Sequence, residues 1–197
     1  MQQLEQWFDE LRRSLEHRSV IIDQGEDPVF FLVYPPRMSL DVYRALPQWE
    51  ARLKHFDWSP RRYNLGLEVQ SYVVNHPFYP RIDEYLRKHP DELEKVQSSI
   101  RDLLSADDDH LVVEEWVEKE IAAASEQKGG LLEITGVELL HPYLQIGRIE
   151  QALQGRISCP VVVFYPGDRT GSFGLKYLRF YEADGNYRSR HIGGFAR

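Results

Sequence analysis

The chain has 197 residues, of which 42% are hydrophobic, 12% aromatic and 28% charged, an ordinary balance for a globular protein with one good core. The aromatic share argues against disorder, because disordered chains lack the apolar surface that offsets the entropy of ordering. The formal net charge of −7 argues against autonomous tight binding of nucleic acid, which needs a clustered basic surface.

Membrane insertion and secretion are not expected either. No apolar run approaches the roughly 20 residues that span a bilayer. The segment from Met1 to Leu15 lacks the basic start, apolar centre and small-residue cleavage site of a signal peptide, so a cytoplasmic protein is expected. The one cysteine, Cys159, can form neither an internal disulfide nor a thiolate metal cage. It lies in an apolar run, which predicts a buried, inert thiol.

The first part of the chain predicts a helix followed by a buried strand. Apolar residues recur at helical spacing between Leu4 and Leu15, which indicates an amphipathic helix. Residues 28–34 form a continuous apolar run that Pro35 and Pro36 close. Runs of this kind, bounded by residues that break regular structure, are typical of strands buried on both faces.

The next part predicts further helices and a second strand. Ser39 is expected to cap a helix, and Pro47 to kink or restart it. Apolar residues alternate over 63–69, so this segment is interpreted as the second strand. Residues 77–128 are mostly helical in their pattern and end at a pair of glycines.

The last third predicts three more strands. Residues 131–135 are expected as the third strand, and a helix is expected at about 142–153. The run at 160–165 is expected as the fourth strand, stopped by Pro166-Gly167. Residues 175–181 alternate and are expected as the fifth strand.

Strands separated by helical patterns imply βαβ units and a mainly parallel sheet. The sequence therefore predicts an α/β fold in which helices cover both faces of a five-stranded sheet, either Rossmann-like or of a degenerate P-loop-like kind. No internal repeat or low-complexity linker divides the chain. A single domain over residues 1–197 is expected, with the mostly helical segment inside it.

The turns at the strand ends are the candidate functional region. In an open parallel sheet, ligands bind outside the carboxyl ends of the strands, so these turns are expected to gather along one edge. The alternative is that proline and glycine merely end strands there. The candidate interaction surface consists of Tyr34, Pro35, Pro36, Thr135, Gly136, His141, Tyr165, Pro166 and Gly167.

No enzymatic motif is found. A phosphate-binding P-loop needs glycines and a lysine, whereas the turn after the first strand has neither, and its two prolines lack backbone N–H donors. A dinucleotide-binding G-x-G-x-x-G, an H-x-x-x-H pair for zinc and a G-x-S-x-G nucleophile elbow are also absent. We therefore expect a protein that is not an enzyme and that uses no cofactor.

Two groups of charged residues leave alternatives open. Glu133, Glu138 and Asp168 lie near strand ends and could hold a metal ion, although their spacing matches no known motif. The basic residues are scattered except near the end of the chain, where a local basic patch would comprise Arg179, Arg188, Arg190 and Arg197.

The last third also carries a family pattern. It consists of the segments 131–137, 141–143 (His-Pro-Tyr), 160–167, Gly171-Ser172 and 175–180, with a late match at 184–188. Together with the tyrosine-proline-proline turn at 34–36, these segments resemble the BrxB family of BREX (bacteriophage exclusion) systems, long catalogued as a domain of unknown function. The sequence Gln145-Ile-Gly-Arg-Ile149 departs from the asparagine-rich stretch expected there.

The resemblance implies a small core subunit of a phage-defence complex that is encoded with a methyltransferase, an ATPase and the alkaline-phosphatase-like protein PglZ. It implies no established catalytic residues. PglZ is the partner expected first, and an acidic, aromatic-rich surface favours a protein partner over nucleic acid. The competing hypothesis is a degenerate nucleotide-binding or metal-dependent nucleic-acid-processing enzyme. Homo-oligomerisation is left open.

Overall fold

The computed structural model describes residues 2–17, 27–106, 110–170, 174–177 and 189–194. In chain order its elements are α1 (Gln2–Glu16), β1 (Val29–Tyr34), the 3₁₀ turn η1 (Pro36–Met38), α3 (Ser39–His55), β2 (Ser59–Asn64), α4 (Leu65–Asn75), α5 (Tyr79–Lys88), α6 (Leu93–Leu103), α7 (Val112–Ser125), β3 (Gly130–Thr135), the 3₁₀ turn η2 (Val137–Leu140), α8 (Ile146–Ala152), β4 (Val161–Thr170), β5 (Gly174–Tyr177) and β6 (Arg190–Gly193).

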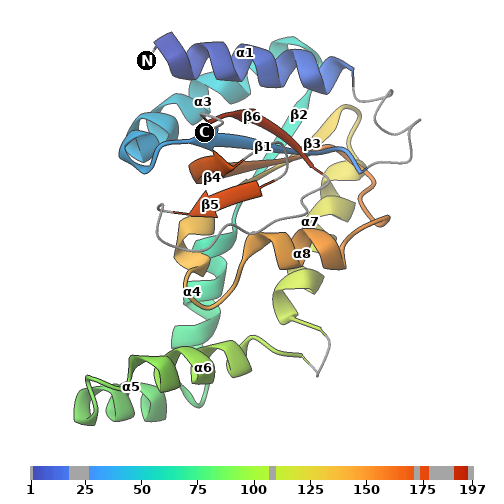
Figure 1. Ribbon diagram of the computed structural model, residues 1–197. Coiled ribbons are helices and arrows are strands. Elements are labelled where there is room, and N and C mark those ends of the chain that lie inside the picture. Colours follow the sequence, from blue (N-terminus) through green and yellow to red (C-terminus); the bar gives the residue numbers. More distant parts are fainter. Residues whose placement is uncertain (1, 18–26, 107–109, 171–173, 178–188, 195–197) are drawn as a thin grey trace.

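A parallel sheet forms the centre of the molecule (Figure 1). Five strands pair in parallel in the order β2-β3-β4-β1-β6, and β5 pairs antiparallel with the end of β4. The predicted α/β class with a mainly parallel five-stranded sheet is therefore confirmed, and the arrangement is consistent with a Rossmann-like fold. The fifth parallel strand is β6, however, and not the segment that the sequence pattern indicated.

The two faces of the sheet are covered by different helices. Along β1, Phe30, Leu32 and Tyr34 pack in a core cluster with residues of α1 and α3. The alternate residues of β1 pack in a second cluster with residues of α4, α6, α7 and α8. Because successive side chains of a strand point to opposite faces, the continuous apolar run is explained by burial on both sides.

The second strand lies earlier in the chain than expected. The segment 63–69 was predicted to be a strand, and this is wrong, because β2 ends at Asn64 and α4 begins at Leu65. Leu65 and Val69 are buried while Leu67 is exposed, so the buried apolar residues follow a helical spacing of four. The Asn64 side chain caps α4 by accepting a hydrogen bond from the Leu67 backbone N–H at 3.0 Å.

The helix after β1 differs in detail from the expectation. Ser39 is the first residue of α3, and its hydroxyl donates to the carbonyl of Pro36 at 2.7 Å, so it does not cap the helix. The helix is continuous through Pro47, which is exposed. Downstream, the helix expected at 142–153 begins only at Ile146.

The fourth strand does not stop at Pro166-Gly167. Tyr34 of β1 is in register with Pro166, and β4 then continues to Thr170 by pairing antiparallel with β5. The predicted strand at 175–181 is thus seen only over Gly174–Tyr177, and its remainder lies outside the described residues. Cys159, just before β4, is buried as expected, and burial raises the pKa of its thiol to about 11.

The predicted helical segment is present as α5, α6 and α7. Helices α5 and α6 pack on each other and project away from the sheet beyond α4, as the lower part of Figure 1 shows. Within the part of the chain that is described, no helix is both long and apolar enough to cross a membrane.

Candidate functional site

The turns named from the sequence lie at one edge of the sheet. Tyr34 at the end of β1 is in register with Pro166 of β4, and Asn64 at the end of β2 is in register with Thr135 of β3. Since all four strands run parallel, their carboxyl ends face the same way. This edge, where β1 to β4 are followed by η1, α4, η2 and the β4–β5 extension, is the candidate site.

The tyrosines of these turns are not surface residues. Tyr34 is 1% exposed and belongs to the core cluster under α1 and α3, while Tyr165 is 3% exposed and meets Phe31 edge-on at 6.0 Å between ring centroids. Of the two interpretations of these turns, an accessible surface and simple strand ends, the burial of both rings favours the second for these two tyrosines. Tyr34 belongs to one core cluster and Tyr165 to the other, so each ring is part of the core.

The other residues of the candidate surface are largely covered as well. Thr135 is buried, and its hydroxyl donates to the carbonyl of Tyr63 at 3.5 Å. Pro36 and His141 are half-buried, and burial lowers the pKa of His141 to about 4. The remaining members, Pro35, Gly136, Pro166 and Gly167, are buried. The turns are thus mostly covered, and the exposed surface at this edge of the sheet is formed by residues that follow the turns.

The turn after β1 is closed by its own hydrogen bonds. The Met38 N–H donates to the carbonyl of Pro35 at 2.8 Å, and both the backbone N–H and the hydroxyl of Ser39 donate to the carbonyl of Pro36. Phosphate-binding turns work by pointing free N–H groups at the anion. Here two residues have no N–H, and the donors of two more are already used.

The turns after β2 and β3 are locked together by a close approach of two glycines. Gly136 has a φ of 76°, which favours glycine, and a Cβ on Gly66 would lie 2.1 Å from the Gly136 carbonyl oxygen and 2.7 Å from Cβ of Leu139. Any side chain at Gly66 would push α4 away from η2. The start of α4 and the turn η2 therefore form one rigid unit at this edge.

A buried carboxylate lies on the α3 face of the sheet, away from the turns. Glu133 is 1% exposed, lies near Glu50 of α3, and has Arg62 Nε 3.9 Å from its Oε2. Arg62 makes a closer ion pair with Glu50. Burial, and then the charge of Glu50, raise the pKa of Glu133 to about 8, because they outweigh the opposing effect of Arg62 and Lys54.

The three carboxylates named as metal candidates do not come together. Glu133 lies under α3, Glu138 accepts a hydrogen bond from the Tyr43 hydroxyl at 2.8 Å, and Asp168 pairs in the β4–β5 ladder. Among the residues that the structure describes, no group of three His, Cys, Asp or Glu side chains is placed to hold a metal ion.

One polar cluster was not foreseen from the sequence. The Ser189 hydroxyl lies 3.3 Å from Glu150 Oε2 on α8 and 3.4 Å from His191 Nε2 on β6. A catalytic triad needs the acid on the far side of the imidazole, to orient the base, whereas this carboxylate contacts the hydroxyl itself. Burial, with the nearby charge of Arg169, lowers the pKa of His191 to about 4. We interpret the cluster as a contact that holds α8 against the edge of the sheet.

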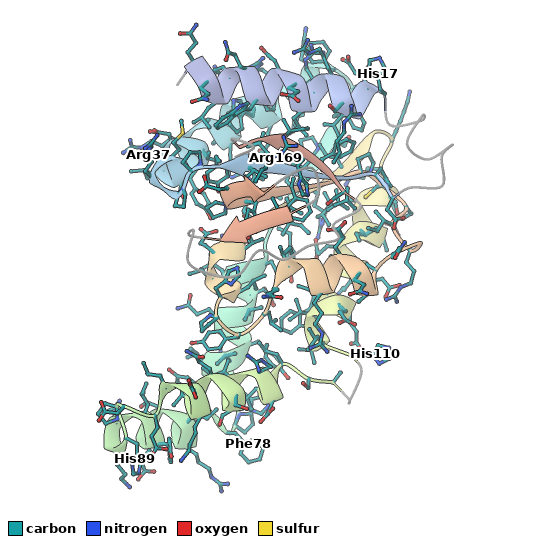
Figure 2. The ribbon with its side chains drawn as sticks, viewed as in Figure 1. His17, Arg37, Phe78, His89, His110 and Arg169 are labelled. Carbon is teal, nitrogen blue, oxygen red and sulfur yellow. The ribbon has the colours of Figure 1, made fainter. Side chains whose placement is uncertain are left out.

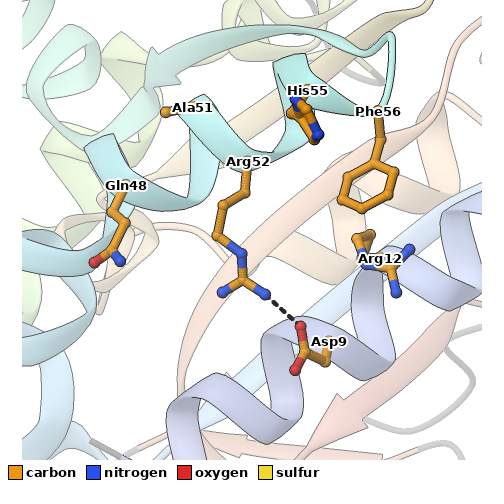
Figure 3. A pocket seen from close by; sticks show the side chains of 7 residues that line it. All are labelled: Asp9, Arg12, Gln48, Ala51, Arg52, His55 and Phe56. Atoms are coloured by element: carbon orange, nitrogen blue, oxygen red, sulfur yellow. Dashed lines mark hydrogen bonds and ion pairs between the residues drawn. The ribbon is translucent and has the colours of Figure 1, made fainter.

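A pocket of about 480 Å³ lies elsewhere, between α1 and α3 (Figure 3). Its arginines are already engaged, since Arg52 pairs with Glu5 at 2.6 Å and with Asp9 at 2.5 Å, and Arg12 stacks over the Phe56 ring at 4.5 Å. These contacts leave little charge for a ligand. Of the basic residues expected to gather late in the chain, Arg190 is exposed, and the other three lie outside the described residues.

Comparison with known proteins gives one match. The model of a family described as BREX protein BrxB matches residues 81–192, a range that begins within α5, ends within β6 and includes every element between them. No curated protein and no solved structure matches the chain.

Proposed function

The chain belongs to the BrxB family, and is thus a component of a BREX anti-phage system; we propose that it acts there without catalysis, by binding other BREX proteins, with PglZ as the first partner. The proposed compartment is the cytoplasm, in keeping with a buried cysteine that has no disulfide. The role proposed is that of an adaptor, whose contribution is a surface of fixed shape.

The observation that supports a non-catalytic role is the closed turn after β1. In an open parallel sheet this is where a bound phosphate would meet backbone N–H groups. Pro35 and Pro36 lack that group, and the donors of Met38 and Ser39 are directed at carbonyls of the same turn. Opening the turn for a nucleotide would cost these bonds, and Pro35 and Pro36 would still offer no N–H.

The competing function is a degenerate nucleotide-binding or metal-dependent nucleic-acid-processing enzyme. It is favoured by the sheet alone, whose carboxyl edge is the usual place for such sites in α/β folds. The separation of Glu133, Glu138 and Asp168 counts against the metal-dependent form among the described residues. The two functions are separated by a direct test of nucleotide binding.

ATP with magnesium is expected to leave the melting temperature of the purified protein unchanged. A ligand adds RT ln(1 + [L]/Kd) to the stability of the folded state, so millimolar ATP bound with micromolar affinity would add about 4 kcal/mol. That gain would raise the melting temperature by several degrees. Differential scanning fluorimetry with magnesium alone as the control measures the shift. An ATP-dependent rise of this size would contradict the proposed non-catalytic role.

A further inference from the structure

Strand β2 forms one edge of the sheet. It pairs with β3 on one side, and among the described residues no strand pairs with it on the other. Its exposure agrees with this position. All residues of β1 and β3 are buried, whereas Arg61 and Arg62 of β2 are exposed and its other residues are half-buried. An open edge presents backbone N–H and C=O groups that can pair with another chain.

The backbone groups on the open side of β2 follow from the bonding on the paired side. The Ser59 N–H donates to the carbonyl of Gly129, just before β3, at 2.7 Å. In a parallel pair, the N–H and C=O of one residue point to the same side, and those of the next residue point to the opposite side. Since Ser59 faces β3, the backbone groups of Pro60, Arg62 and Asn64 face away from it.

Two further features agree with this assignment. Pro60 has no N–H, and proline is tolerated in an edge strand where that group would face away from the neighbouring strand. Tyr63, which should face β3, has its carbonyl 3.5 Å from the Thr135 hydroxyl. Within the described ranges, no backbone hydrogen bond outside the sheet ladder uses the N–H or C=O of Arg62. The open side therefore offers the carbonyl of Pro60, both groups of Arg62 and the N–H of Asn64.

The charged side chains of β2 are held over the two faces of the sheet. Arg61 pairs with Glu120 of α7 at 2.5 Å, and Arg62 pairs with Glu50 of α3. Proline and charged side chains are common on edge strands, because they limit aggregation through backbone pairing. In β2 they leave four backbone groups open, so they restrict pairing at this edge without preventing it.

We propose that the open edge of β2 binds an extended segment of a protein partner in the BREX complex, which joins the sheet as a further strand. The proposal rests on the proposed function and specifies its surface. The backbone groups identify the occupant, since N–H and C=O groups at this spacing are matched by the backbone of another extended segment. A second copy of the chain is disfavoured, because antiparallel pairing about Arg62 would place two arginines directly opposite each other.

Arg62→Pro tests the edge, with Arg62→Ala as the matched control. Both variants lose the ion pair with Glu50, but only Arg62→Pro also loses the outward N–H and places a ring where the added strand would approach. In calorimetric titrations with purified PglZ, and then with each other BREX protein encoded beside it, Arg62→Pro is expected to bind about tenfold or more weakly than Arg62→Ala. The two variants should have similar melting temperatures, because the Arg62 N–H faces away from β3.

Amide hydrogen exchange, followed by nuclear magnetic resonance, tests the edge without any substitution. In the free chain the amides of Arg62 and Asn64 should exchange quickly and those of Arg61 and Tyr63 slowly, because only the second pair faces β3. Binding of the partner should slow the exchange of Arg62 and Asn64 about tenfold or more. The amide of His89, on the helices that project away from the sheet in Figure 2, is the internal control and should not change.

The outcomes separate the edge from the proposed function. If the partner binds, slows neither the Arg62 nor the Asn64 amide, and binds Arg62→Pro as tightly as Arg62→Ala, the edge is not the docking site and the proposed function stands. A wild type that binds none of the BREX proteins would overturn both. Protection of Arg62 and Asn64 that grows with the concentration of the chain alone would assign the edge to a second copy and overturn the proposal.

Discussion

Tyr34→Ala is expected to lower the free energy of unfolding by about 3 to 5 kcal/mol, the usual cost of removing a large aromatic side chain from a core. Tyr34 is 1% exposed and packs in the cluster that joins β1 to α1 and α3. Alanine would leave a cavity at a place where two helices and the sheet meet. Chemical denaturation with fluorescence or circular dichroism measures the loss, and Tyr165→Ala should behave in the same way.

Arg37→Ala is the matched control, because Arg37 lies three residues from Tyr34 and is exposed. Its effect on stability should stay within about 0.5 kcal/mol. The fraction of Tyr34→Ala that remains folded should bind the partner with normal affinity, since the ring is not on the surface. If Tyr34→Ala melts like the wild type but no longer binds the partner, Tyr34 is an interface residue, and its placement in the core is contradicted.

Glu133→Gln is expected to stabilise the protein at alkaline pH. The buried Glu133 keeps its proton to about pH 8 in the folded protein, whereas an ordinary glutamate loses it near 4.5. Because the folded state binds this proton more tightly than the unfolded chain does, the stability of the wild type falls as pH rises through that interval. Glutamine imitates the protonated acid and does not titrate. The variant should therefore exceed the wild type by about 2 kcal/mol or more above pH 8.

The difference in the free energy of unfolding between Glu133→Gln and the wild type should narrow toward pH 5, where the wild-type carboxyl is protonated in the folded protein. Urea denaturation at a series of pH values gives both curves. Glu120→Gln is the control, because Glu120 on α7 pairs at 2.5 Å with Arg61, which is partly exposed and lies on β2 next to Arg62. Glu120→Gln should change the free energy of unfolding by less than about 1 kcal/mol at every pH. Parallel pH curves for the wild type and Glu133→Gln would show that Glu133 is ionised in the folded protein at neutral pH.

The sequence indicated the class of fold well because its signals are local. Continuous apolar runs correctly placed β1, β3 and the parallel part of β4, since strands buried on both faces show no alternation. The segment 63–69 was misread because three alternating apolar residues fit a strand and a helix equally well. β6 was missed because its four residues, including Arg190 and His191, lack the apolar run by which buried strands are recognised.

The candidate site could be predicted less well, because it depends on contacts between distant parts of the chain. Topology alone correctly predicted that the turns gather at one edge of the sheet. The burial of Tyr34, however, depends on α1 and α3 covering the last residue of β1. Glu133 lies close to Glu50 and Arg62, which no local pattern reveals. The exposure of Leu40 could have been predicted, since Leu40 is out of phase with the buried stripe of α3 that includes Val42 and Trp49.

Co-purification tests the central claim most directly. The tagged chain is expressed with untagged PglZ and the other BREX proteins of its gene cluster, and the complex is isolated by affinity and size-exclusion chromatography. The proposed role predicts that PglZ elutes with the chain in a fixed ratio, and that the complex forms without added nucleotide. A chain that elutes alone, together with ATP hydrolysis or nuclease activity in that fraction, would contradict the account.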